Sequence, residues 1–433
     1  MAKQIKVIKC PQCGSVKNTL LKPDYYKCNS CATEYFLDSD DVNINHHYPS
    51  SPTTTDTGSP VVKLVSKIFV GLLLVYLLFT FAFAFFSKSS SRLATSAENK
   101  DRWNDAEVSF FESNKKAVFI TVGIKESGHS QSPSSVYVGF YDAQSGKNIK
   151  MDELGIKEKD ADVTYQRFDN GDFYFIVNKK RLYKVDQQSL TAKEVSPDTY
   201  NTVPDLQTGF AKIEFYYKGY GDAFNLVSNA GKELYYYPAI QKTYTYHEMC
   251  KAQNEVQKDP SNTPVITRFK FSTKSSDYEN EKIQLIQYKQ KAPVGVPVNR
   301  PFFCWTKDYG SYGLHNGDDQ PQKTLMQDYY KKTGRVISYK DFTPDRLYFD
   351  PTVLDFNDKL VLITYKPTPA ENEHYLVQLL NASTAQIIWT LPLELTYQPQ
   401  DGRITNSGYF VKAGSSNYFI GPNGKIITEY NYR

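Results

Sequence analysis

One apolar stretch constrains this chain more than any other feature. It runs from Ile68 to Phe86 (IFVGLLLVYLLFTFAFAFF) without a charge, between Lys63 and Lys67 on one side and Lys88 on the other. At ~1.5 Å per residue, its nineteen residues span about 28 Å as a helix, close to the thickness of a bilayer's hydrocarbon core. A buried core helix is seldom apolar on every side for this length, and a cleaved signal peptide would start earlier. The stretch therefore predicts a single transmembrane helix.

Composition narrows the class of protein on either side of that helix. Hydrophobic residues make up 40% of the 433 residues, too few for a membrane protein with many spans. Aromatic residues reach 15%, with 34 Tyr and 26 Phe, and such residues favour β-sheet. The net charge of +4 makes a general nucleic-acid binder unlikely, because these proteins usually show a concentrated basic face.

The first 37 residues contain a metal-binding pattern. Cys10 and Cys13 form one C-x2-C pair, Cys28 and Cys31 form a second, and fourteen residues separate the pairs. Two such turns supply the four thiolates of a closed tetrahedral Zn²⁺ site, which is structural because no coordination position stays open. A unit this small needs the metal to fold. The alternatives are two disulfides or an iron site.

The segments KCPQCGS and YYKCNSCATEYF, which hold these cysteines, resemble the zinc ribbons that head many bacterial membrane proteins and some transcription factors. The resemblance implies a module that binds nucleic acid, binds protein or only folds. Few basic residues surround the cysteines, and Asp38, Asp40 and Asp41 follow them, which favours a protein partner or none. Residues 38–62 are rich in Ser, Thr, Asp and Pro, which predicts a flexible linker.

Residues 93–433 change to an alternating pattern of apolar and polar positions. Apolar runs are split by Gly, Asn and Asp turns, which is the hairpin signature. Such runs occur at 117–124, 136–151, 173–195, 210–217, 224–237, 359–366, 374–393 and 417–432. Repeats of about forty residues with several strands each predict a mainly β domain, a β-propeller of seven or eight blades. Residues 244–256 and 322–333 break the rhythm and predict short helices or inserted loops.

Residues 375–393 (YLVQLLNASTAQIIWTLPL) resemble one repeat of the PQQ-like propellers. Asn381, Thr384 and Trp389 match that repeat, and Ala385 stands where the family prefers Gly. Residues 136–151 carry the same turn without the Trp. A WD-repeat-like propeller, another propeller or a pair of β-sandwiches stays open, and the resemblance implies no quinone or metal site.

No catalytic or cofactor-binding residue is predicted. The domain lacks a Gly-x-Ser-x-Gly elbow, a phosphate-binding loop and a His-Glu-x-x-His motif, and its histidines are scattered. The acidic turns at 169–172 and 316–319 could bind calcium, but such turns are usually only turns. The sequence thus leaves enzymatic activity open and leans against it.

The cysteines also bear on topology. Thiolate zinc sites persist where thiols stay reduced, which predicts that the N-terminus is cytosolic. The protein would then span the inner or plasma membrane once, with its propeller in the periplasm or outside the cell. Cys250 and Cys304, the two cysteines beyond the apolar stretch, would then form a disulfide. The charges beside the stretch point the other way, because Lys88, Arg92 and Lys100 follow it.

The predicted function is a single-pass membrane protein whose propeller is a scaffold for a protein or glycan partner. One alternative is a propeller enzyme, a hydrolase or lyase that acts on cell-surface glycans. Another is a transmembrane signalling component. Carboxylates and histidines that converge on the central channel would favour the enzyme, whereas an aromatic or apolar patch on the rim would favour binding.

Overall fold

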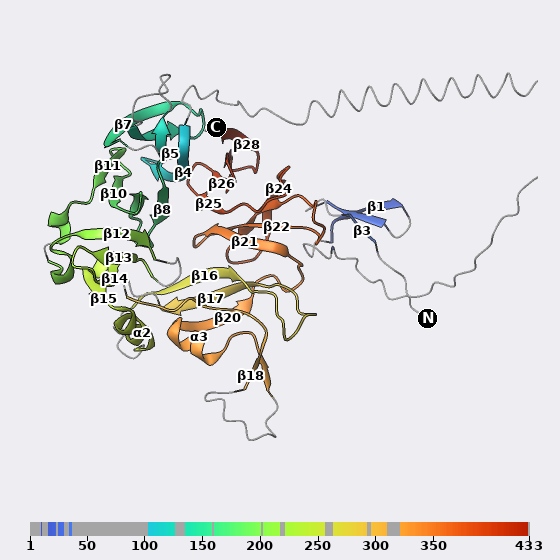
Figure 1. Ribbon diagram of the computed structural model, residues 1–433. Coiled ribbons are helices and arrows are strands. Elements are labelled where there is room, and N and C mark those ends of the chain that lie inside the picture. Colours follow the sequence, from blue (N-terminus) through green and yellow to red (C-terminus); the bar gives the residue numbers. More distant parts are fainter. Residues whose placement is uncertain are drawn as a thin grey trace, which may run out of the picture.

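The predicted hairpins are present, and they assemble into a ring of sheets (Figure 1). The computed structural model describes residues 10, 16–22, 25–29, 34–36, 103–125, 135–157, 160–200, 202–216, 221–255, 263–291, 296–309 and 321–431. The predicted linker and the apolar stretch at 68–86 lie outside these residues. Within the described ranges, no helix is both long and apolar enough to cross a membrane.

Blades 1 to 3 each consist of four antiparallel strands that follow one another in the chain. Blade 1 contains β4 (Trp103–Ser113), β5 (Lys116–Lys125), β6 (Ser135–Asp142) and β7 (Asn148–Lys157). Blade 2 contains β8 (Val163–Arg167), β9 (Phe173–Val177), β10 (Arg181–Asp186) and β11 (Thr191–Glu194). Blade 3 contains β12 (Phe210–Phe215), β13 (Phe224–Ser228), β14 (Glu233–Tyr237) and β15 (Lys242–Tyr244).

Blades 5 and 6 have the same order, and blade 4 departs from it. Blade 4 pairs β16 (Val265–Phe271), β17 (Leu285–Lys291) and β20 (Val336–Asp341). Blade 5 contains β21 (Phe349–Phe356), β22 (Leu360–Lys366), β23 (Leu376–Asn381) and β24 (Ile387–Pro392). Blade 6 contains β25 (Asp401–Ile404), β26 (Tyr409–Ala413), β27 (Ser416–Ile420) and β28 (Ile426–Asn431).

The β-propeller prediction is confirmed, but seven or eight blades is wrong, because the described chain forms six. The forty-residue estimate fails at two blades. Blade 1 has strands of up to 11 residues, and blade 4 carries an insertion between its second and third strands. The two stretches that break the repeat, 244–256 and 322–333, contain helices α2 (Tyr246–Asn254) and α3 (Asp328–Thr333), as predicted.

A recurring turn explains why the repeat is visible in the sequence. In blade 5, the Asn381 carboxamide oxygen accepts hydrogen bonds from the backbone N–H groups of Ser383 (2.9 Å) and Thr384 (3.0 Å). Asp142 in blade 1 accepts a similar bond from the N–H of Ser145 at 2.8 Å. Four residues after each acceptor the chain adopts a left-handed conformation, with φ of 60° at Ala385 and 65° at Gly146. An Asx turn followed by a left-handed residue closes the hairpin.

Shared apolar clusters fill five of the six seams between neighbouring blades. The seam between blades 1 and 6 closes the ring without a strand exchanged between their sheets. Polar contacts cross it, among them the ion pair of Lys412 with Glu107 at 2.5 Å, and aromatic side chains fill it. Phe110 and Phe410 stack there with their ring centroids 4.6 Å apart, and Phe119 packs on Phe410 at 4.9 Å. All three side chains are at most 1% exposed.

The seam between blades 3 and 4 differs from the others. Among the described residues, no apolar cluster contains side chains of both blades. Helix α2 packs on blade 3 through Met249 and contacts α3 of blade 4. A polar contact also crosses the seam, because the Gln253 amide donates to the carbonyl oxygen of Val298 at 3.3 Å.

The N-terminal segment forms a separate three-stranded antiparallel sheet of β1 (Asn18–Lys22), β2 (Tyr25–Cys28) and β3 (Glu34–Phe36). Cys10 and Cys28 are each 1% exposed and share one cluster, against which Tyr26 and Ile387 of β24 pack. Figure 1 shows this sheet beside blade 5.

Candidate functional site

The structure describes two of the four cysteines that are predicted to bind zinc. It brings Cys10 and Cys28 into one buried cluster, whereas Cys13 and Cys31 lie outside the described residues. Within those residues, no group of three or more His, Cys, Asp or Glu side chains is placed to hold a metal. The zinc site therefore stays a prediction.

Cys250 and Cys304 are free thiols in the structure, so the predicted disulfide is not formed in it. Cys250 lies on α2 and packs with the tyrosines of blade 3. Cys304 is buried in blade 4, where its thiol contacts the carbonyl oxygens of Lys274 at 3.7 Å and Trp305 at 3.8 Å. The two side chains thus pack in separate surroundings.

The acidic turn at 169–172 has its carboxylates engaged within the protein. Asp169 forms an ion pair with Arg268, and Asp172 forms one with Lys184 at 2.8 Å. The turn at 316–319 lies outside the described residues, as do His129 and His315. His247 and His374 are exposed and lie in different blades. No calcium site or histidine centre follows from these residues.

Charged side chains gather where the first strands of the blades converge on the central axis. We call this set the axial belt, and all six blades contribute to it. Its members are Glu112, Arg167, Asp169, Asp222, Arg268, Asp355 and Arg403.

Hydrogen bonds within the axial belt tie one blade to another. Arg403 of blade 6 donates to Asp355 of blade 5 at 3.3 Å, and the backbone N–H of Ile404 donates to the same carboxylate at 2.7 Å. Glu112 of blade 1 accepts two bonds from Asn406, at 2.6 and 2.7 Å. Each of these carboxylates therefore already accepts donors from the protein.

Burial shifts the ionisation of the axial belt. It raises the pKa of Asp355 even though Arg403 lies beside that carboxyl. Burial and the nearby Arg403 lower the pKa of Arg167. Both carboxylate oxygens of Asp355 accept hydrogen bonds, one from Arg403 and one from the N–H of Ile404, so this side chain links blades 5 and 6. In the described part of the axial belt, Asp355, Glu112 and Asp169 each have a partner within the protein.

The insertion in blade 4 is an addition that the ring does not require. Between β17 and β20 the chain forms the hairpin of β18 (Thr306–Asp308) and β19 (Gln322–Thr324), and then α3. Elaborations of a rigid scaffold commonly carry its function, so this insertion is the first place to look for a binding surface.

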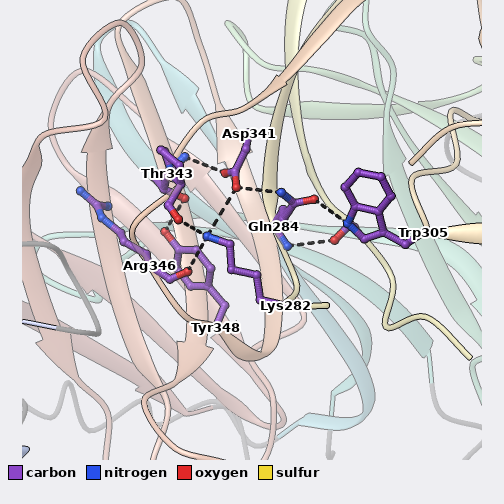
Figure 2. A network of polar contacts seen from close by, with 9 residues as sticks. Lys282, Gln284, Trp305, Asp341, Thr343, Arg346 and Tyr348 are labelled. Carbon is purple, nitrogen blue, oxygen red and sulfur yellow. Dashed lines mark hydrogen bonds and ion pairs between the residues drawn. The ribbon is translucent and has the colours of Figure 1, made fainter. Parts of the chain in front are cut away.

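A polar network fixes the base of the insertion (Figure 2). Asp341 accepts hydrogen bonds from the backbone N–H of Thr343 (3.0 Å) and from the Gln284 amide (2.9 Å). The carbonyl of Gln284 in turn accepts from the Trp305 indole at 3.1 Å. Trp305 directly precedes β18, so this relay connects the end of β20 to the start of the inserted hairpin.

Lys282 joins the same network from the opposite side (Figure 2). Its ammonium lies 3.5 Å from Asp341 and donates to the carbonyl oxygens of Pro344 and Arg346. Tyr348 donates to the Thr343 hydroxyl at 3.0 Å. The network joins the insertion to the segment that leads into blade 5, where the Arg346 guanidinium donates to the carbonyl oxygen of Ala385 at 2.6 Å.

Three exposed aromatic side chains and the half-buried Tyr330 lie on the insertion and on α2. We call Tyr246, Phe302, Tyr329 and Tyr330 the aromatic strip. The Tyr330 ring packs on Tyr329 at 5.3 Å and on Phe302 at 5.4 Å between centroids. Tyr246 lies on α2, and this helix contacts α3, which carries Tyr329. Tyr246 is 66% exposed and Tyr329 is 55% exposed, unlike the tyrosines that cover the sheets.

A groove of about 500 Å³ adjoins the aromatic strip between α3 and β20. Its cationic lining residues are Lys291, Lys331, Lys332 and Arg335. The three lysines are exposed, and none forms an ion pair with another described residue. Aromatic and cationic residues together are typical of protein-binding surfaces.

Sequence reasoning missed this face of the molecule. The signal was present, because the segment QDYYKK places two tyrosines and two lysines where the strand pattern stops. Tyrosines outside the period-two pattern do not cover a sheet, and that distinction separates the aromatic strip from the core. The axial belt could be recognised only after the first strand of each blade was known.

Of the comparisons with known proteins, only the one with solved structures gives matches, and their similarity is low. No family model and no characterised sequence matches the chain. The β-propeller domain of the Trilobed protease from Pyrococcus furiosus, described as having an open velcro topology, is 9% identical with a TM-score of 0.29; the match covers 75% of this chain and 84% of that one. Saccharomyces cerevisiae Sqt1 is 10% identical with a TM-score of 0.23, over 76% and 86% of the two chains. Likenesses this low carry no argument about function.

Proposed function

We propose that this protein is a single-pass membrane-anchored binding platform whose propeller presents the aromatic strip to a protein partner. The observation that carries the proposal is the strip itself, where the exposed Tyr329 shares helix α3 of the insertion with the exposed Lys331 and Lys332. Tyr and Trp are the residues that most often anchor protein interfaces. A propeller supplies the rigid base that such an interface needs.

A hydrolase or lyase is the weaker reading of the same structure. Glycoside hydrolysis needs two carboxylates that flank a substrate, one of them a proton donor. At the described axis, Asp355 is engaged by Arg403 and Glu112 by Asn406. The exposed aromatic side chains lie on the rim, as expected for a binding protein.

The membrane anchor in the proposal rests on the sequence at 68–86, and the zinc ribbon rests on Cys10, Cys13, Cys28 and Cys31. The joint burial of Cys10 and Cys28 in one cluster supports a common site for these two side chains. We propose that the ribbon binds one structural Zn²⁺ and is cytosolic.

One contact argues against placing the ribbon and the propeller on opposite sides of a membrane. Ile387 of β24 packs against Cys10 and Cys28, and a single span would separate these residues. Labelling of single cysteines at Thr19 and at Ser383 with an impermeant maleimide, in sealed membranes, tests the topology. The proposal predicts that position 19 is labelled only from the cytosolic side and position 383 only from the opposite side. Labelling of both from the same side contradicts it.

Site-specific photo-crosslinking tests the binding face. A photoreactive phenylalanine derivative replaces Tyr329 in the intact protein, and the same derivative replaces Tyr397 as the control. Tyr397 is 45% exposed but follows blade 5, away from the insertion. In native membranes we expect a discrete crosslinked protein from position 329 and none from 397. The absence of a crosslink at 329, or the same products from both positions, overturns the proposal.

A further inference from the structure

The groove between α3 and β20 concentrates positive charge. Four cationic residues line it against one acidic residue, Asp328, which gives a local excess of three positive charges (4 − 1). The whole chain carries only +4, so this excess is not a general property of the surface. Opposite charge on a partner would be attracted here and oriented by the field.

The lysines of the groove have no structural task that explains them. Lys331 and Lys332 lie in the last turn of α3, where a positive charge interacts favourably with the helix C-terminus by ~0.3–1 kcal/mol. A single lysine would be enough to interact with the C-terminus of α3. Lys291 cannot have this role, because it lies on strand β17. The ammonium groups remain hydrated and available to an anionic ligand.

The groove also has an apolar element that selects among anionic ligands. Ile337, which lines it, is 47% exposed although it lies on a strand of blade 4. Tyr329 stands on the same helix as the two lysines. Covering these side chains removes apolar surface from water, which contributes about 25 cal/mol per Å². An acidic polysaccharide has no apolar side chain to place there, whereas a peptide has.

We propose that this groove binds an acidic segment of a protein partner, with carboxylates against Lys331 and Lys332 and an apolar side chain on Ile337. The inference rests on the proposed function, because it names the chemistry of the partner at the same face. It adds that recognition depends on charge and weakens as salt is raised.

Fluorescence anisotropy with a defined probe tests the inference. The intact protein in nanodiscs of neutral phosphatidylcholine is titrated into a fluorescein-labelled peptide of four Glu-Glu-Leu repeats. A peptide of four Gln-Gln-Leu repeats and an oligogalacturonate of similar charge are the comparison ligands. The test variant combines Lys331→Glu with Lys332→Glu. The matched control combines Lys147→Glu with Lys180→Glu, two exposed turn lysines of blades 1 and 2.

We expect the Glu-Glu-Leu peptide to bind and the double reversal in the groove to raise its Kd by about tenfold or more, the equivalent of about 1.4 kcal/mol. The control reversal should leave Kd within about twofold. A Lys331→Gln, Lys332→Gln variant, which removes charge without reversing it, should fall between them.

Three outcomes overturn the inference: the same Kd for the groove variant and the wild type, equal binding of the Gln-Gln-Leu peptide, or lysine-dependent binding of the oligogalacturonate alone. If photo-crosslinking at Tyr329 still succeeds while the acidic peptide does not bind, the binding face stands and only its acidic chemistry fails.

Discussion

Truncation of Phe410 tests how much aromatic packing contributes to closing the ring. Phe410 is fully buried, and its ring centroid lies 4.6 Å from that of Phe110, 4.9 Å from Phe119 and 5.1 Å from Phe419. Three surrounding aromatic rings cannot collapse into the space that Phe410→Ala leaves. The expected loss of unfolding free energy is therefore about 4 kcal/mol, within the usual 3–5 for a buried Phe. Phe410→Leu should cost only about 1–2 kcal/mol.

Urea unfolding of residues 93–433, followed by circular dichroism, measures this loss. The matched control is Phe224→Ala in the seam between blades 2 and 3, where Phe224 is equally buried and packs on Phe168 at 5.2 Å and Phe215 at 5.5 Å. The two truncations should agree within about 1 kcal/mol. A loss below about 1 kcal/mol for Phe410→Ala, with a normal loss for Phe224→Ala, refutes a large contribution of aromatic packing to closure.

Three further predictions concern separate parts of the chain. Ala385→Gly should raise the unfolding free energy by about 0.5–1 kcal/mol, because Ala385 has a φ of 60° that costs an L-residue energy; a lower stability in urea unfolding contradicts this. Burial and the nearby Arg300 lower the pKa of Lys270 to about 7, so the free energy of unfolding should decrease as pH falls from about 10 toward 7. Lys270→Met should make this decrease smaller. If the free energy of unfolding changes by the same amount between the two pH values in the variant, the assignment is wrong. Residues 1–37 should bind one Zn²⁺ and lose it in a Cys28→Ser, Cys31→Ser variant, as measured by metal analysis; retention of zinc excludes this ligand set.

The strands were predictable because the sequence pattern that specifies each hairpin lies within the hairpin itself. Asn381 and the residues up to Ala385 specify a turn by themselves, and this turn pairs the apolar runs on either side of it, β23 and β24. The number of blades was not predictable in the same way. β20 reads VISYKD, with little alternation, and an insertion separates it from β17. Nothing local indicates that these two strands pair.

The functional surfaces depend on long-range contacts, and the sequence shows them less well. Arg268 and Asp169 are 99 residues apart, and Asp355 and Arg403 are 48 apart. Only the closed ring brings such pairs together, so no spacing rule reveals them. Tyr329 is different, because its place beside Lys331 and Lys332 is local. Its exposure, however, depends on where α3 packs.

Recovery of the partner by the intact protein tests the central claim most directly. The wild type, a Phe302→Ala, Tyr329→Ala variant and a Tyr397→Ala control are each purified from native membranes in mild detergent, and the proteins bound to them are quantified. The account predicts one stoichiometric partner, identical to the protein that crosslinks at position 329, with the wild type and the control. The strip variant should lose it, since removal of interface anchors costs ~2 kcal/mol or more. Equal recovery of that partner by the strip variant would contradict the claim that this face of the propeller binds it.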